Sequence, residues 1–128
     1  MTKIIVTGGL GFIGSNLIEL LLKKKFKVLN IDKVTYASNF YNARDFQRNK
    51  NYSFKKCDLT NVNQLKKIIK TYKPKAIFNL AAETHVDRSI DGPKNFIFSN
   101  IIGTFNILEI IRKSKIKIKL IHISTDEV

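Results

Sequence analysis

The end of the sequence places two carboxylates side by side. Asp126 and Glu127 follow Thr125, directly after the apolar run KLIHIS at 119–124. Two carboxyl groups held close together tend to share one proton, so one of them can act as an acid while the other acts as a base. A solvated polar loop is the alternative interpretation, because Thr-Asp-Glu is also a common start of a helix. The residue types alone do not decide between a catalytic pair and a polar loop. They also do not show which of the two carboxyl groups would be the acid and which the base.

A glycine-rich stretch near the start, TGGLGFIG, is typical of a phosphate-binding turn. Two glycine spacings fit it: G-x-G-x-x-G at Gly9, Gly11 and Gly14, and G-x-x-G-x-x-G at Gly8, Gly11 and Gly14. It lies between a strand-like and a helix-like run, the context that a dinucleotide-binding turn requires. Glycines let the backbone approach a pyrophosphate, and the first N–H groups of the helix attract it, including those of Phe12 and Ile13. The alternative is a glycine turn without a ligand.

Acidic residues follow the next two strand-like runs. Asp32 stands where a carboxylate accepts hydrogen bonds from an adenosine ribose and repels a 2′-phosphate, which favours NAD over NADP. Lys33 next to it weakens that preference, and a simple turn residue is the alternative for Asp32. Asp58, in KKCDLT, is expected near the adenine. A helix N-cap is an equally good interpretation of Asp58.

The segment NLAAETH follows a fourth strand-like run, at the edge of the sheet where ligands bind in such folds. Leu80, Ala81 and Ala82 are small or apolar enough for a cofactor to lie against their backbone. Thr84 is placed to reach a nicotinamide ribose or a substrate. We therefore include these four residues in the candidate cofactor site.

Strand-like and helix-like runs alternate along the chain. Five apolar runs are predicted strands: KIIVT (3–7), KVLNI (27–31), YSFKK (52–56), KAIFNL (75–80) and KLIHIS (119–124). Three stretches with helical spacing lie between them, at 13–25, 63–72 and 93–113, and 34–51 is a long, partly helical connection. In the third helix Ile101, Phe105 and Leu108 recur at this spacing. His122, within the last strand, is expected in the core.

This alternation predicts an α/β fold with a doubly wound parallel sheet, the NAD-binding Rossmann fold. No helix-like run follows the fifth strand, whereas a doubly wound sheet commonly continues to about six strands. We therefore expect residues 1–128 to be the N-terminal part of a Rossmann domain, truncated after about the fifth strand. The remainder of the domain and the substrate-binding part would be absent from this chain.

Composition excludes several classes of protein. The net charge is +13, but it comes mostly from dispersed lysines, so nucleic-acid binding is not expected. No apolar run reaches the roughly 18 residues that cross a bilayer, so a membrane partner is not expected either. One cysteine, Cys57, rules out an internal disulfide and fits a cytoplasmic protein. The spacing of His, Cys and carboxylates indicates no metal site.

Several motifs together resemble the extended short-chain dehydrogenase/reductase family, and within it the dTDP-glucose 4,6-dehydratase branch. They are TGGLGFIGSNL, NIDKVTYASN, CDLTN, NLAAETHVDRSIDGPKNFIFSNIIGT and HISTDEV. Asp-Glu after the threonine is the feature most similar to this branch. The resemblance implies further NAD contacts at Lys33, Thr35, Leu59 and Ser99.

The resemblance also implies a lyase reaction on a nucleotide-bound glucose such as dTDP-glucose. NAD oxidises C4, water is lost across C5 and C6, and the hydride returns to C6, which gives a 4-keto-6-deoxy sugar. Asp126 would be the acid and Glu127 the base, while Thr125 would bind the 4-hydroxyl. The alternatives are a nucleotide-sugar epimerase, a dehydratase of another nucleotide sugar, and a non-catalytic NAD-binding regulator.

The oxidation step in this family needs a tyrosine and a lysine in the pattern Y-x-x-x-K on a helix. Tyr52 and Lys56 fit the pattern but lie on a predicted strand, so we interpret the match as a coincidence. The functional pair would follow Val128. The chain alone is therefore expected to be inactive, and the complete protein is expected to be a homodimer.

Overall fold

The computed structural model describes residues 1–34, 39–81 and 98–124. Its strands are β1 (Lys3–Thr7), β2 (Lys27–Asp32), β3 (Tyr52–Lys56), β4 (Ala76–Asn79) and β5 (Lys119–His122). Its helical elements are α1 (Phe12–Lys23), the 3-10 turn η1 (Phe40–Ala43), α2 (Val62–Tyr72), the π-helical turn η2 (Phe98–Ile102) and α5 (Gly103–Lys113). The predicted strands are all present, with bounds close to those expected from sequence.

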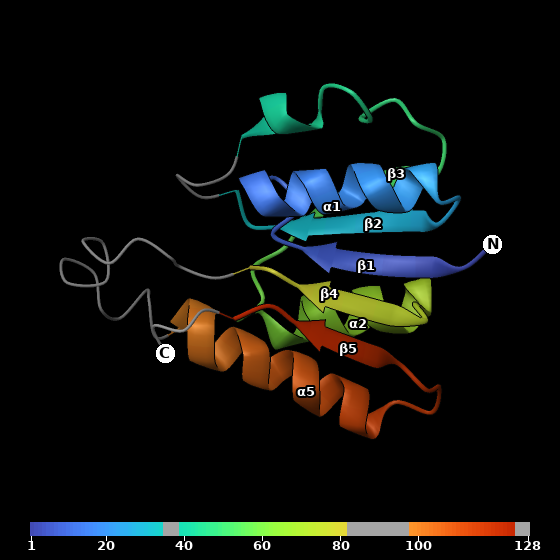
Figure 1. Cartoon of the computed structure of the whole chain (residues 1–128). Helices are drawn as coiled ribbons and strands as arrows, with labels where there is room; N and C mark the ends of the chain where they lie inside the picture. The colour runs from blue at the N-terminus through green and yellow to red at the C-terminus, as the bar shows by residue number, and fades with distance from the viewer. Residues whose placement is uncertain (35–38, 82–97, 125–128) are drawn as a thin grey trace, which may run out of the picture.

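The strands form one parallel sheet in the order β3-β2-β1-β4-β5. The chain moves outward from β1 in one direction and then returns to the other side, which is the doubly wound arrangement. This confirms the predicted fold class. Because all strands are parallel, their carboxyl ends lie at one edge of the sheet, where the arrowheads of β1, β2, β4 and β5 meet (Figure 1).

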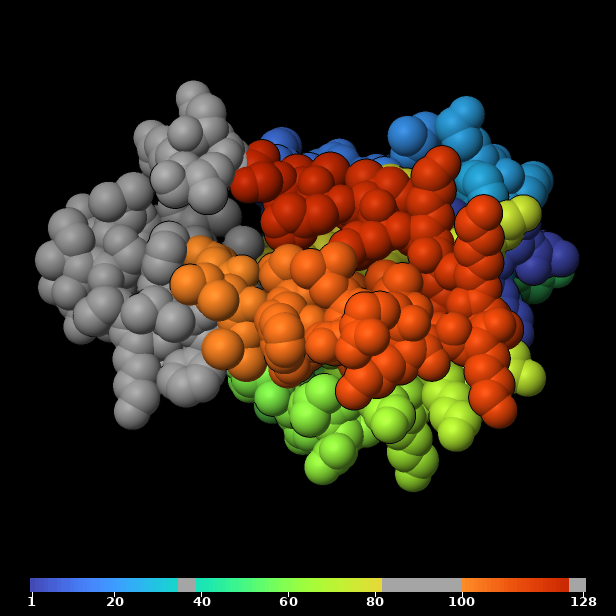
Figure 2. All heavy atoms as spheres, turned by 90° about the horizontal axis from the view of Figure 1, so that it is seen from below, coloured from blue at the N-terminus to red at the C-terminus, as the bar shows by residue number. Residues whose placement is uncertain are grey.

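Both faces of the sheet are covered. Alternate residues of β1 point to opposite faces: Ile4 and Val6 pack with α1, whereas Ile5 packs with α2 and α5. Helices on both faces explain why the inner strands β1 and β2 are buried almost continuously, whereas the edge strand β3 is not. Figure 2 shows α5 lying across one face of the molecule, between β5 and α2.

The apolar residues of α5 divide between two faces. Ile107 is fully buried in the core, but Phe105 and Leu108, and Ile101 in the preceding turn η2, are 56%, 51% and 59% exposed. The recurring apolar positions that predicted this helix are therefore not its core face. Among the described residues, no helix has the length and apolar character needed to cross a membrane.

Tyr72, at the end of α2, has a buried hydroxyl without a hydrogen-bond partner among the described residues. Burial raises its pKa to about 12. Because an unsatisfied buried hydroxyl costs free energy, we expect Tyr72→Phe to raise the free energy of unfolding by about 1 kcal/mol, measured by urea denaturation. Tyr52→Phe is the matched control, since the Tyr52 hydroxyl accepts a hydrogen bond from Asn30 and its loss should cost about 1 kcal/mol. Destabilisation by Tyr72→Phe would mean that the hydroxyl has a partner.

Candidate functional site

The turn between β1 and α1 is closed by backbone hydrogen bonds. Gly8 N–H donates to the carbonyl of Ile31 at 2.8 Å, and Gly11 N–H donates to the carbonyl of Gly8 at 3.2 Å. Gly8 has φ +73°, and a Cβ there would lie 2.8 Å from the Ala81 nitrogen. Glycine at position 8 is therefore required both by the backbone conformation and by the neighbouring chain after β4.

The other glycines of the turn fall into two groups. A Cβ at Gly9 would collide with the side chains of Asn30 and Ile18, and one at Gly14 would collide with the carbonyl of Gly8. At Gly11 the nearest described atom is the Gly8 carbonyl oxygen at 3.4 Å. Packing within the described chain thus explains glycine at 9 and 14, but not at 11.

The turn leads into the start of α1. Gly11 is the N-cap with extended backbone, and no side chain among the described residues caps the helix. The first intrahelical bond runs from Ser15 N–H to the Gly11 carbonyl at 2.9 Å, so the N–H groups of residues 12–14 precede the helical ladder. Phe12 and Ile13 are 78% and 65% exposed. A helix start of this kind is suited to bind an anion such as a phosphate.

Asp32 fixes this turn to the end of β2. Its carboxylate accepts hydrogen bonds from Leu10 N–H at 3.2 Å and from Val34 N–H at 2.7 Å, and the residue is 6% exposed. Asp32 thus has a structural role in the turn. A carboxylate can accept about four hydrogen bonds, so this role is compatible with the predicted contact to a ribose.

Asn30 supports the same turn and was missed in the sequence. It is fully buried, its Oδ1 accepts from Gly9 N–H at 2.9 Å, and its Nδ2 donates to the Tyr52 hydroxyl at 3.1 Å. The available signal was a polar residue inside the otherwise apolar run KVLNI. Asn30 joins the glycine turn to β3.

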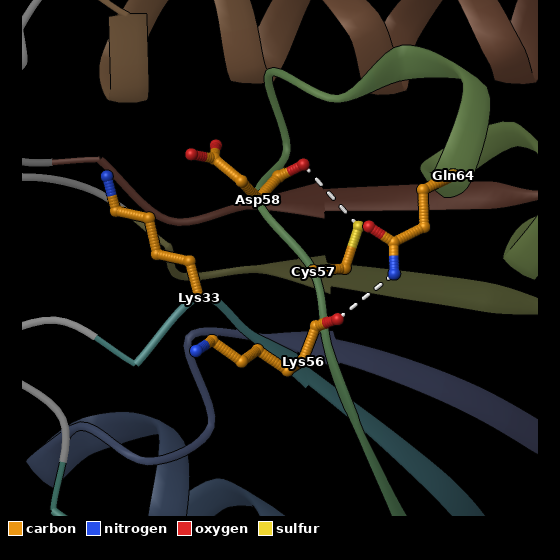
Figure 3. Close-up of a pocket in the computed structure, with 5 residues that line it drawn as sticks. All are labelled: Lys33, Lys56, Cys57, Asp58 and Gln64. Carbon is orange, nitrogen blue, oxygen red and sulfur yellow. Dashed lines mark hydrogen bonds between the residues drawn. The ribbon is translucent and has the colours of Figure 1, made fainter.

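A pocket of about 400 Å³ lies at the carboxyl ends of β2 and β3. It is lined by Lys33, Lys56, Cys57, Asp58 and Gln64 (Figure 3). The predicted contacts Lys33 and Asp58 therefore lie together, whereas Lys56 and Gln64 were not predicted. Gln64 Nε2 donates to the Lys56 carbonyl at 3.1 Å, which joins α2 to β3.

Asp58 does not cap α2, so that alternative is wrong. Asn61 is the N-cap, with Oδ1 accepting from Gln64 N–H at 3.2 Å. Asp58 Oδ1 instead accepts from the N–H and the hydroxyl of Thr60, at 3.0 and 2.9 Å. The predicted contact Leu59 is 7% exposed and packs in the core, and its carbonyl accepts from Asn106 Nδ2 at 2.8 Å.

Cys57 is buried in the core at 2% exposure, which fits a structural rather than a reactive thiol. Burial, and then the Asp58 carboxylate, raise the pKa of Cys57 from 9.0 to about 11. Because the pKa of Cys57 is higher in the folded state than in the unfolded state, the thiol contributes fully to the free energy of unfolding below pH 9. This contribution is lost as the pH rises from 9 towards 11.

The rise in the Cys57 pKa predicts a loss of stability at alkaline pH. We expect the free energy of unfolding to fall by about 1 kcal/mol between about pH 8 and pH 10 through this thiol. Cys57→Ala should remove that part of the decline, measured by denaturant titrations across the range. An identical decline in the variant would show that the thiol does not contribute.

The backbone after β4 lies against the glycine turn. Leu80 and Ala81 N–H both reach the Thr7 hydroxyl oxygen at 3.2 Å, and Ala81 contacts Gly8 as described above. His122, at the end of β5, is exposed, so its predicted place in the core is wrong. It lies on the edge strand of the described sheet, where its ring nitrogen is 3.0 Å from Asn79 Nδ2.

Several predicted site residues lie outside the described residues: Thr35, Ala82, Thr84, Thr125, Asp126 and Glu127. Ser99 lies in η2, and nothing is stated of its side chain. The described part of β5 ends at the same edge as β1 and β4, because Asn79 pairs with both Thr7 and His122. Among the described residues, no three His, Cys, Asp or Glu side chains form a group that could hold a metal.

The chain matches the protein family described as GDP-mannose 4,6 dehydratase over residues 5–128. The chain belongs to this family. It is 43% identical to the dTDP-glucose 4,6-dehydratase of Salmonella typhimurium, over 98% of this chain and 37% of that protein. It is also 43% identical to the Haemophilus influenzae dTDP-glucose 4,6-dehydratase, over 100% of this chain and 40% of that protein.

Similar proteins of known structure share the fold. A dTDP-glucose 4,6-dehydratase from Bacillus anthracis, in complex with NAD, has a TM-score of 0.87 at 38% identity and covers 100% of this chain. A UDP-glucose 4-epimerase from Thermotoga maritima, with UDP-glucose, has a TM-score of 0.85 at 31% identity and covers 97% of this chain. The chain covers 39% and 38% of those two structures, so it spans about two fifths of each.

Proposed function

We propose that the chain is the N-terminal part of the NAD-binding domain of a dTDP-glucose 4,6-dehydratase. The observation that carries this proposal is Gly11. Packing within the described chain requires the glycines at 8, 9 and 14, but a side chain at 11 would meet only one described atom, at 3.4 Å. A pyrophosphate lying against the uncapped start of α1 would explain the glycine, because a side chain at position 11 would occupy the space of the phosphates.

The other predicted contacts extend this site along the edge of the sheet. The phosphates would meet the N–H groups at residues 12–14, and the adenosine ribose would meet Asp32. The pocket beside Lys33 and Asp58 is placed for the adenine. The backbone of Leu80 and Ala81 forms the wall on the other side of the glycine turn. This arrangement fits a dinucleotide that crosses the sheet at the point where strand order reverses.

The chemistry follows from the family and from the residues after β5. Bound NAD would accept the hydride from C4 of the sugar and return it to C6. We propose that Asp126 protonates the leaving 6-hydroxyl, that Glu127 removes the C5 proton and that Thr125 binds the 4-hydroxyl. The strand that leads to these three residues ends at the edge that carries the glycine turn, which supports this assignment.

Three other functions remain as alternatives, of which one is a dehydratase of another nucleotide sugar with the same chemistry. A nucleotide-sugar epimerase is supported by the fold similarity to the T. maritima enzyme. It has less support than the dehydratase because Asp126 and Glu127 supply the acid and base that loss of water needs. A non-catalytic NAD-binding regulator would have no use for that pair.

The test is turnover of dTDP-glucose by the complete protein, of which we propose this chain is a part. We expect NAD to co-purify and a 4-keto-6-deoxy sugar to form, detected by its ultraviolet absorbance in alkali. A product that keeps its 6-hydroxyl would indicate the epimerase. Tight NAD binding without turnover of dTDP-glucose would indicate the regulator or a dehydratase of another nucleotide sugar, and turnover of a different nucleotide sugar would separate these two. Absence of NAD binding would overturn the proposal.

We further propose that the complete protein is a cytoplasmic homodimer, with α5 at the interface. A single cysteine fits a cytoplasmic location. The exposed apolar residues Phe105 and Leu108 on α5 and Ile101 in the preceding turn η2 support the dimer. Phe105→Glu is expected to shift the complete protein from dimer to monomer in sedimentation velocity, with Phe40→Glu, at 53% exposure in η1, as the control. A variant that stays dimeric would exclude α5 from the interface.

A further inference from the structure

A hydrogen-bonded network of Thr7, Asn79 and His122 links three strands beneath the proposed cofactor edge of the sheet, and it runs from two buried residues to His122 at the surface. Thr7 and Asn79, at the ends of β1 and β4, are each 1% exposed, and their side-chain oxygens lie 2.6 Å apart. Asn79 Nδ2 is 3.0 Å from His122 Nδ1 on β5 and 3.4 Å from the Thr104 hydroxyl on α5. Buried polar groups of this kind are costly unless all of them are satisfied.

The hydrogen-bond directions in this network of side chains follow from a count of the available protons. The Thr7 hydroxyl oxygen accepts from the N–H groups of Leu80 and Ala81, so its own proton must be donated elsewhere. The acceptor within reach is Asn79, which must therefore present its oxygen to Thr7 and its NH₂ group to His122. His122 Nδ1 is then an acceptor, which requires the tautomer with the proton on Nε2.

We infer that His122 is a positioning residue that acts through Asn79 and Thr7 on the backbone of Leu80 and Ala81. Its Nδ1, at 3.0 Å, is the nearer of the two acceptors for the Asn79 NH₂ group and stabilises the orientation that the Thr7 proton also requires. Without it, the NH₂ group keeps only the Thr104 hydroxyl at 3.4 Å, so the amide is held less firmly. When the amide rotates, its nitrogen meets a hydroxyl whose lone pairs are already used. The Ala81 N–H is the group most exposed to this change, because Leu80 N–H also donates to the Thr7 carbonyl at 3.2 Å.

The position of this backbone matters because it contacts the glycine turn. A Cβ at Gly8 would lie 2.9 Å from the Ala81 Cα, so movement after β4 is transmitted to the turn. His122 also lies three residues before Thr125 in the sequence, and Ile123 N–H donates to the Asn79 carbonyl at 3.1 Å. The contacts from His122 through Asn79 to Thr7, which we call the relay, therefore join the strand that leads to the proposed acid and base to the wall of the proposed NAD site. Its effect on NAD binding rests on the proposed function.

The first test is independent of NAD. In this chain, the ¹⁵N signals of the His122 ring should show the Nε2–H tautomer, and amide hydrogen exchange at Ala81 should be about tenfold faster in His122→Ala. His122→Asn should restore slow exchange, since the Asn oxygen occupies the place of Nδ1. Lys119→Ala, at an exposed position on the same strand, is the control and should change nothing.

The second test uses the complete protein. We expect His122→Ala to bind NAD about tenfold more weakly and His122→Asn to remain within about threefold of wild type. Unchanged Ala81 exchange in His122→Ala, or equal effects of the two variants, would overturn the relay. Absence of NAD binding by the wild type would overturn the proposed function instead, while the exchange measurement would still decide the relay.

Discussion

Gly11→Ala is expected to weaken NAD binding by at least about a hundredfold while changing the free energy of unfolding by less than about 1 kcal/mol. The backbone at Gly11 has φ −76°, which any residue adopts, so alanine causes no strain. The new methyl group would meet the Gly8 carbonyl at 3.4 Å and otherwise extend to where we place the pyrophosphate. Isothermal titration with NAD and urea denaturation of the complete protein measure the two quantities.

Gly14→Ala is the matched control variant, because it adds the same methyl group three residues further along the chain. Its Cβ would collide with the Gly8 carbonyl and lie 2.8 Å from the Gly9 Cα, both of which are backbone and cannot move aside cheaply. We expect a loss of about 3 kcal/mol in the free energy of unfolding. If Gly11→Ala were as destabilising as Gly14→Ala, or bound NAD normally, Gly11 would not mark the cofactor site.

The sheet could be predicted from sequence because β1, β2, β4 and β5 contain short apolar runs with β-branched residues, and because the aromatic residues of YSFKK indicate β3. The glycine turn could be predicted because its position between a strand and a helix is part of the motif. The end of α2 could be predicted too, because Pro74 follows a face formed by Leu65, Ile68 and Ile69. These features are local, so neighbouring residues suffice to specify them.

The buried polar contacts could not be predicted, because they depend on which strands are neighbours. Thr7 and Asn79 are far apart in the sequence and meet because β4 lies beside β1. The alternation of strands and helices does not give that order. The same limit applies to α5, where apolar residues occur on two faces and periodicity alone cannot tell the core face of Ile107 from the exposed face of Phe105.

Asn30→Ala should also have a large effect, a loss of about 3 kcal/mol in the free energy of unfolding. The variant removes the acceptor for Gly9 N–H, in a buried contact, and the donor to the Tyr52 hydroxyl, in a partly buried one; Asn30 itself is fully buried. It leaves these two groups unsatisfied and a small cavity between the turn and β3. Asn63→Ala, at an exposed position of α2, is the control and should cost less than about 0.5 kcal/mol.

A double-mutant cycle separates the two halves of the Asn30 contribution. Tyr52→Phe should cost about 1 kcal/mol in the wild type but close to nothing in Asn30→Ala, because the donor that the hydroxyl meets is already gone. The remaining cost then belongs to Gly9 N–H, which only Asn30 satisfies among the described residues. Full additivity of the two variants would mean that the 3.1 Å contact between Asn30 and Tyr52 contributes no stability.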